Sequence, residues 1–107
     1  MESQQPFRII YAPITRVHLR AIEAKYYSLI RRIIEERLSA APDLQTRHRK
    51  PLKRPVSFGA TWELRFGPGN RFRVLYDIDR TQHVVAVLAI GLKRGNRLLI
   101  GGEEIRL

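Results

Sequence analysis

Residues 61–79 read TWELRFGPGNRFRVLYDID, and this stretch decides the fold. Apolar and polar side chains alternate in residues 62–66 and again in residues 72–78, which is the two-residue period of a half-buried strand. Between the two runs, Gly-Pro-Gly-Asn at residues 67–70 supplies the residue types of a tight turn. The stretch therefore predicts a β-hairpin.

The register of this hairpin determines what each of its faces carries. An odd offset, which a bulge in the turn allows, sets Trp62, Leu64 and Phe66 beside Phe72, Val74 and Tyr76. The opposite face then collects charged side chains from the hairpin and from the segment after Ile90: Glu63, Arg65, Arg71, Arg73, Asp77, Lys93, Arg94 and Arg97. Such a face is either the solvated side of a two-layer domain or a phosphate clamp.

A third strand follows the hairpin. Residues 79–82 have turn composition, and residues 83–90 are nearly all apolar, which favours a central strand covered at least partly on both faces. The three runs predict an antiparallel meander. We expect one core, in which the strands contribute Trp62, Leu64, Val74, Tyr76 and Leu88 and the helices contribute Ile22, Leu29, Ile33 and Ile34.

The first half of the chain has a helical period. Residues 7–11 predict a short strand that stops at Pro13. Apolar residues then recur at steps of three and four: Leu19, Ile22, Tyr26, Leu29, Ile30, Ile33, Ile34 and Leu38. Ile14, Val17 and Ala21 lie roughly 150° out of phase with that stripe. We therefore expect a helix break between Ile22 and Tyr26, a second helix ending before Pro42, and an α+β fold.

Size and composition limit the function. A chain of 107 residues has the length of one domain, and 20 Lys and Arg against 10 Asp and Glu favour anionic partners. The absence of cysteine excludes thiolate chemistry and favours the cytoplasm. The N-terminus lacks the pattern of a signal peptide, and no apolar run is long enough to span a membrane, so we expect no membrane association.

The order of the motifs resembles the RelE/ParE superfamily of toxins from bacterial type II toxin-antitoxin systems. The resemblance covers almost the whole chain and is carried by the basic Lys50-Pro51-Leu52 segment, W-x-L-R-x-G from Trp62, R-x-R-V-L-Y-x-I-D from Arg71, and I-G-x-K from Ile90. It implies a compact fold of an N-terminal strand, a helical hairpin or broken helix, and an antiparallel β-meander. It also implies an inhibitory antitoxin partner, whose acidic segment we expect on the basic face, with the helical face as the alternative.

Members of the superfamily divide into ribosome-dependent mRNA endonucleases and DNA gyrase inhibitors, and a degenerate, inactive toxin is a third possibility. For the nuclease branch the resemblance implies catalysis without metal or cofactor, in which Arg65, Arg73 and Lys93 act on the scissile phosphate of ribosome-bound mRNA. We expect Arg73 to be an exposed strand residue. The residues expected to hold the substrate are Lys53, Arg54, Arg71, Arg94 and Arg97.

Two departures from the nuclease pattern concern proton transfer. Glu63 stands where these nucleases often carry a lysine, and Leu98 and Leu99 stand where a late tyrosine is often found. Glu63 is a candidate proton-transfer group, but neighbouring guanidinium groups favour its ionised form and hence a salt bridge. The chain's three histidines lack the spacing of metal ligands, so no metal site is expected.

Overall fold

The computed structural model describes residues 5–54 and 56–107. Residues 1–4, part of the N-terminal stretch discussed above, and Pro55, which ends the basic segment, lie outside them. The helices are α1 (Thr15–Arg20) and α2 (Tyr27–Ala40), with 3₁₀ turns at Ala24–Tyr26 and Pro68–Asn70. The strands are β1 (Arg8–Tyr11), β2 (Arg49–Pro51), β3 (Trp62–Phe66), β4 (Phe72–Asp79), β5 (Val84–Arg94), β6 (Arg97–Ile100) and β7 (Glu103–Ile105).

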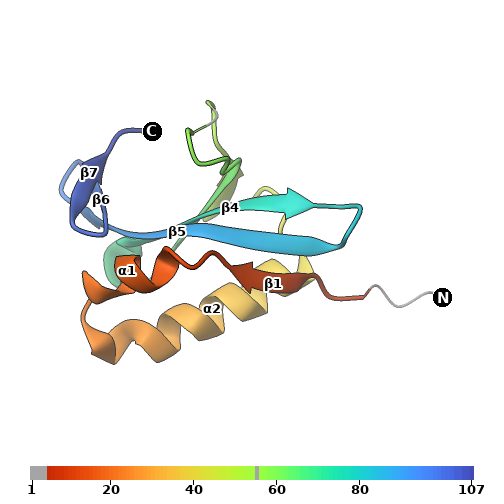
Figure 1. The fold of residues 1–107 in the computed structure, drawn as a ribbon, viewed down its shortest axis with the longest axis horizontal. Coiled ribbons are helices and arrows are strands. Elements are labelled where there is room, and N and C mark those ends of the chain that lie inside the picture. The colour runs from red at the N-terminus through yellow and green to blue at the C-terminus, as the bar shows by residue number, and fades with distance from the viewer. Residues whose placement is uncertain (1–4, 55) are drawn as a thin grey trace.

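The strands form one sheet, and both helices lie on the same side of it (Figure 1). The order is β2-β3-β4-β5-β6-β7 with antiparallel neighbours, while β1 pairs in parallel with β5. One edge of the long strand β5 is shared, because β1 pairs with residues 84–87 and β6 with residues 91–94. The predicted α+β architecture is confirmed, and β5 is its centre.

The predicted hairpin register is also confirmed. Trp62 pairs with Tyr76 and Phe66 with Phe72, so the apolar sets of β3 and β4 share one face. The turn depends on Gly67, whose φ of 83° lies in the left-handed region and whose missing Cβ would collide with the ring of Phe72. The charged set of β3 and β4 is thereby turned toward the face that carries no helix.

The helix break occurs where the phase change predicts it. α1 ends at Arg20, α2 begins at Tyr27, and the Tyr27 hydroxyl donates a hydrogen bond to the Leu19 carbonyl across the break. α2 ends at Ala40, ahead of Pro42 as expected. The later apolar stripe of α2 is turned toward the sheet, whereas Ile14 and Val17 on α1 remain exposed. No helix among the described residues is long and apolar enough to cross a membrane.

The main core lies between the helices and the sheet. Its buried residues are Ile22, Ile30, Ile34, Leu38, Leu64, Phe66, Phe72, Val74, Tyr76, Val85, Val87 and Ile90. Trp62, Leu29 and Ile33 pack against it at partial burial, in agreement with the expected core. Leu88 is the exception and packs on the other face of the sheet, because a bulge opposite Leu75 and Tyr76 shifts the alternation of β5 by one residue.

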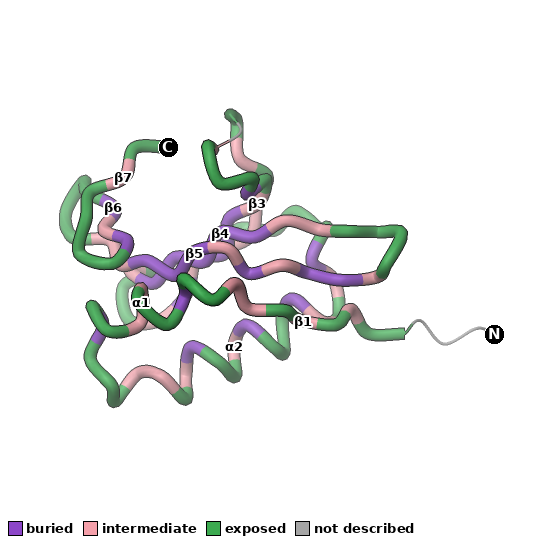
Figure 2. The backbone as a smooth tube through the Cα atoms, viewed as in Figure 1, coloured by how far each residue is buried: buried purple, intermediate pink, exposed green. Residues whose placement is uncertain are grey.

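A second, smaller core lies on the face without helices. Its buried residues are Ala60, Leu75, Ala89, Leu98 and Ile100, and Leu52, Val56, Leu88 and Ile105 pack against them. Burial therefore extends to both sides of β4 and β5 (Figure 2). The short strands β2, β6 and β7 were not predicted. Of these, β2 and β7 form edges of the sheet, and β6 lies between β5 and β7. A turn at residues 101–102 connects β6 to β7.

Candidate functional site

A cleft of about 850 Å³ opens on the face of the sheet opposite the helices. Residues 50–54 and the β6–β7 hairpin rise from that face and form its two walls (Figure 1). Its cationic lining consists of Lys50, Lys53, Arg54, Arg65, Arg73, Lys93, Arg97 and Arg106. Its two acidic lining residues are Glu63 and Glu104. The excess of cations makes the cleft suited to an anionic ligand.

Arg73 lies on the floor of the cleft and is only 7% exposed. Its Nε donates a hydrogen bond to the Asn70 carbonyl at 3.1 Å, and its Nη1 lies 3.8 Å from Oε2 of Glu63. Burial lowers the pKa of Arg73, and this is opposed by the nearby Glu63 carboxylate. Arginine still keeps its charge at neutral pH. The expectation that Arg73 is exposed is therefore wrong, because Arg73 lies on an interior strand, paired with Arg65 on β3 and Gly91 on β5 and in contact with Glu63.

Glu63 is the acidic partner of the floor and is 3% exposed. Its Oε1 accepts a hydrogen bond from Nε of Arg65 at 2.8 Å, while Oε2 faces Arg73. Lys50 is its cross-strand neighbour on β2. A carboxylate buried among cations and engaged at both oxygens is placed as a salt-bridge partner, in line with the interpretation that the sequence favours.

Gly91 allows one wall to pack directly onto the floor. It pairs with Arg73 on β4 and with Ile100 on β6, so it stands between the buried cation and the hairpin. A Cβ at this position would approach the Leu99 carbonyl oxygen to 2.9 Å and Cγ1 of Ile100 to 3.0 Å. Only glycine lets β6 lie this close to β5, and this places the β6–β7 hairpin at the edge of the cleft.

Most of the predicted site residues meet in the cleft. Those that line it are Lys53, Arg54, Glu63, Arg65, Arg73, Lys93 and Arg97. The sequence analysis missed Lys50 and Arg106 as lining residues, because it assigned no strand to β2 or β7. No local pattern marks Lys50 as a strand residue, because residues 47–50 are all basic or polar. Asp77 alternates with Arg73 and Leu75 along β4 and so keeps the expected face, where it accepts a hydrogen bond from the Thr61 hydroxyl at 2.6 Å, but it does not line the cleft.

Arg71 does not reach the cleft. Its Nη2 donates a hydrogen bond to the Tyr26 hydroxyl at 2.8 Å, and its guanidinium group lies 5.1 Å from the centroid of that ring and 5.5 Å from that of Phe72. The reason is local, because the helical φ of −80° and ψ of −18° at Arg71 interrupt the two-residue alternation before β4 begins. Arg71 thus ties the helical layer to the sheet.

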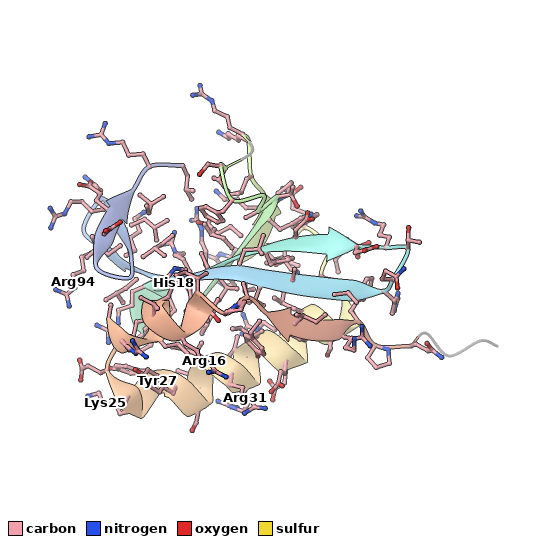
Figure 3. All side chains as sticks on the ribbon, viewed as in Figure 1. Arg16, His18, Lys25, Tyr27, Arg31 and Arg94 are labelled. Carbon is pink, nitrogen blue, oxygen red and sulfur yellow. The ribbon has the colours of Figure 1, made fainter. Side chains whose placement is uncertain are left out.

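Arg94 is also placed away from the cleft. It lines a hollow of about 240 Å³ on the other side of the sheet, together with His18 of α1 (Figure 3). Strand alternation explains this placement, because the preceding residue, Lys93, points into the cleft. The two residues adjacent in sequence therefore serve opposite faces.

No histidine or tyrosine lines the cleft among the described residues. His18 accepts a hydrogen bond at Nδ1 from the Ile90 amide at 3.3 Å, and burial lowers its pKa. His83 stacks on Phe7 with ring centroids 3.8 Å apart. Within residues 5–54 and 56–107, no three His, Asp or Glu side chains are grouped so that they could hold a metal ion. The chemistry available in the cleft is that of fixed cations.

The fold is similar to that of a protein of known structure. No protein-family model matches the sequence, and no curated protein matches it in sequence. The crystal structure of the RelBE2 toxin-antitoxin complex from Mycobacterium tuberculosis contains a chain that superposes with a TM-score of 0.64 at 24% sequence identity. The match covers 82% of this chain and 99% of that chain. The chain therefore has the fold of a RelE-type toxin.

Proposed function

We propose that residues 1–107 form one domain that acts as the toxin of a type II toxin-antitoxin system. The domain cleaves ribosome-bound mRNA in the cytoplasm and uses neither a metal nor a cofactor. The observation that carries this proposal is the cleft floor, where the buried Arg73 lies beside Arg65 on the neighbouring strand and Lys93 lines the same space. The likeness to a chain of a toxin-antitoxin complex supports the first part of the proposal.

Fixed cations suit cleavage by the RNA's own 2′-hydroxyl. In that reaction the 2′-hydroxyl gives its proton to solvent water and its oxygen forms a bond to the adjacent phosphorus. The bond from phosphorus to the 5′-oxygen breaks, and the 5′-oxygen takes up a proton from water. Between these events negative charge builds up on the phosphoryl oxygens. Arginine binds two such oxygens at once, and a cation held in place before the reaction stabilises the transition state without reorganising. Arg73 is held in this way by burial and by its bond to Asn70.

The walls suit a single strand that enters the cleft on one side and leaves on the other. Lys50, Lys53 and Arg54 stand on one wall, and Arg97 and Arg106 on the other. Cationic side chains on both sides of a groove follow a phosphate backbone without reading its sequence. The same charges favour an acidic segment of the antitoxin, which would block the cleft by occupying it.

A non-enzymatic inhibitor of DNA gyrase is the second candidate. It is favoured by the absence of histidine and tyrosine among the described lining residues and by Leu98 in the wall where a proton-transfer residue would be useful. A degenerate toxin, with the fold but without the activity, has the same features. The experiment must therefore read out translation and DNA supercoiling separately.

The test compares two arginines that lie two positions apart and on opposite faces of the sheet. Because Arg73 is buried, Arg73→Lys and Arg73→Met are better probes than alanine, which would leave a void. Arg73→Met should lower mRNA cleavage by about a hundredfold to a thousandfold, and Arg73→Lys by less, because lysine keeps the charge but loses the planar fork. Arg71→Met is the matched control and should cleave at the wild-type rate.

Primer extension on ribosome-bound mRNA after induced expression provides the measurement, with circular dichroism to confirm that each variant is folded. Cuts made by the wild type and by Arg71→Met, and absent in Arg73→Met, would support the nuclease. A wild type that makes no cuts but blocks supercoiling by purified gyrase would replace the nuclease with the gyrase inhibitor. A wild type that does neither would identify the degenerate toxin.

A further inference from the structure

We propose that Glu63 is a positioning residue, which aims Arg65 at the phosphate, compensates the buried charge of Arg73 and limits the charge of the empty cleft. Its effect on cleavage rests on the proposed function, whereas its effect on the two arginines does not. The proposal assigns Glu63 no proton transfer. It rests on the contacts that Glu63 makes with Arg65 and Arg73 on the floor of the cleft.

Both arginines are held through Nε. Nε of Arg65 donates to Oε1 of Glu63 at 2.8 Å, and Nε of Arg73 donates to the Asn70 carbonyl at 3.1 Å. A guanidinium group has five N–H donors, and the four on its terminal nitrogens form the edge that recognises a phosphate. Anchoring each group at Nε leaves terminal nitrogens available to the ligand. The contact of 3.8 Å between Nη1 of Arg73 and Oε2 of Glu63 is too long for a strong hydrogen bond.

Glu63 also explains how Arg73 is tolerated at 7% exposure. A buried cation is costly unless an opposite charge lies nearby, and Oε2 of Glu63 is the nearest such charge. One carboxylate between two guanidinium groups leaves the trio with a net charge of +1. Glu63 thus lowers the cost of burying positive charge at the floor, and the remaining charge of +1 still attracts a phosphate.

The surroundings of Glu63 argue against a role as general base. Arg65 lies beside it on β3, Arg73 lies on β4, Lys50 is its cross-strand partner on β2, and Leu75 is its partner on the other side. The side chain is 4% exposed, and Oε1 already accepts a hydrogen bond. A base needs an oxygen within hydrogen-bond reach of the 2′-hydroxyl. At 4% exposure, and with Oε1 already bonded to Arg65, the Glu63 carboxylate is poorly placed to reach that hydroxyl.

The main variant is Glu63→Gln, and Glu104→Gln is its matched control. Both remove one negative charge from the lining of the same cleft. Among the described residues Glu104 forms no ion pair within 4.0 Å, whereas Glu63 contacts two arginines. Any difference between the variants therefore reports on the contacts of Glu63 rather than on the charge of the cleft.

The first measurement follows the arginine Nε–H groups by NMR, without any substrate. Glu63→Gln should speed hydrogen exchange at Nε of Arg65 by tenfold or more, because a neutral amide is a weaker acceptor than a carboxylate. Nε of Arg73 should stay protected by Asn70, and Glu104→Gln should change neither signal. Unchanged protection of Arg65 in Glu63→Gln would overturn the proposal, whatever the protein's activity.

The second measurement separates binding from cleavage. Both variants should bind a non-cleavable 2′-O-methyl RNA oligonucleotide a few times more tightly than the wild type at low salt, because each cleft gains one net positive charge. At saturating RNA, Glu63→Gln should cleave about tenfold to a hundredfold more slowly than Glu104→Gln, because misaligned cations stabilise the transition state less well. Its pH profile should keep the shape of the wild-type profile.

The outcomes separate the alternatives. A general base would give Glu63→Gln a pH profile that has lost its acidic limb while the Arg65 signal is unchanged, and that result would reject positioning. If the wild type cleaves no RNA, the proposed nuclease fails, but the NMR and binding measurements still decide the role of Glu63. If Glu63→Gln does not fold, Glu63→Asp takes its place, because it keeps the charge but withdraws the carboxylate by about 1.5 Å, one C–C bond. It should then lose Arg65 protection while remaining folded.

Discussion

The two faces of the sheet are built on different principles. The helical face is closed by a large apolar core, in which side chains such as Ile34 and Leu38 are fully buried. The cleft face has a smaller core, and beside that core lie a buried arginine and a buried glutamate. Burial of apolar side chains on the helical face stabilises the fold. Burial of charged side chains on the cleft face costs free energy of folding but holds those charges at the lining of the cleft. The helical face thus carries most of the apolar packing, and the cleft face carries the buried charges.

The largest expected effect tests the helical face. Ile34 on α2 is completely buried in the main core. Ile34→Ala should lower the free energy of unfolding by about 2 to 5 kcal/mol, because it removes apolar contacts and leaves a cavity. Urea denaturation provides the measurement. The spectrum of the Arg65 and Arg73 side chains should be unchanged in the folded fraction, because Ile34 lies on the far side of the sheet.

Leu29→Ala is the control on the same helix. Leu29 packs against the main core at partial burial, so its truncation should cost less than that of Ile34. Equal losses for the two variants would contradict the burial gradient along α2. A large change in the arginine signals of folded Ile34→Ala would show that the helical face and the cleft face are coupled, which would contradict their independence.

The intermediate effect tests the cleft face at Gly91. Gly91→Ala would bring a Cβ to 2.9 Å from the Leu99 carbonyl oxygen, which is backbone and has to move. We expect a loss of about 1 to 3 kcal/mol in the free energy of unfolding, as is typical of overpacking. Cleavage should also fall, because the β6–β7 wall moves away from Arg73.

Ala86→Ser is a control on the same strand, at a partly exposed position paired with Ile10 and Asp77. It should change stability by no more than about 0.5 kcal/mol and leave cleavage unaffected. If Gly91→Ala is as stable and as active as the wild type, the hairpin is free to move away and does not define the wall.

Much of this organisation could be predicted from the sequence, because alternation and phase are local properties. The pairing of Trp62 with Tyr76 followed from the period of two on each side of a glycine-rich turn. The helix break followed from the different phase of Ile14 and Val17. In both cases the residues that carry the signal lie within a few positions of the feature that they predict.

The failures come from features that local patterns do not contain. Leu88 was assigned to the wrong face because a bulge shifts the register of β5, and no residue type marks that bulge. Arg71 was assigned to the cleft because strand alternation was assumed to begin there. The turn instead gives Arg71 a helical backbone conformation, which local alternation does not reveal. The burial of Arg73 depends on neighbours from other strands, such as Glu63 and Gly91. The second core was not predicted, because β2, β6 and β7 are strands of three or four residues, too short for a recognisable period.

The smallest expected effect concerns His18, which links helix α1 to strand β5 of the sheet. Along one edge of β5, β1 pairs as far as Val87 and β6 begins at Gly91, and His18 accepts the Ile90 amide hydrogen bond in the gap between them. Burial lowers the pKa of His18 in the folded state. As the pH falls below about 6.5, the unfolded chain therefore takes up a proton that the folded chain does not. Stability should fall until the pH reaches the folded pKa, and this contribution should be constant below it.

His18→Asn isolates that contribution, because the Asn oxygen takes the place of Nδ1 as acceptor but does not titrate. The difference in unfolding free energy between wild type and variant should be constant above pH 7.5 and should shift in favour of the variant below pH 6.5. His48→Asn is the control, because His48 lies in the loop before β2, away from the gap. Curves that stay parallel for His18→Asn would mean that His18 keeps its proton equilibrium on folding. Such a result would require the Ile90 amide to be equally stable beside a protonated His18. A protonated imidazole cannot accept a hydrogen bond at Nδ1, so we expect the curves to diverge.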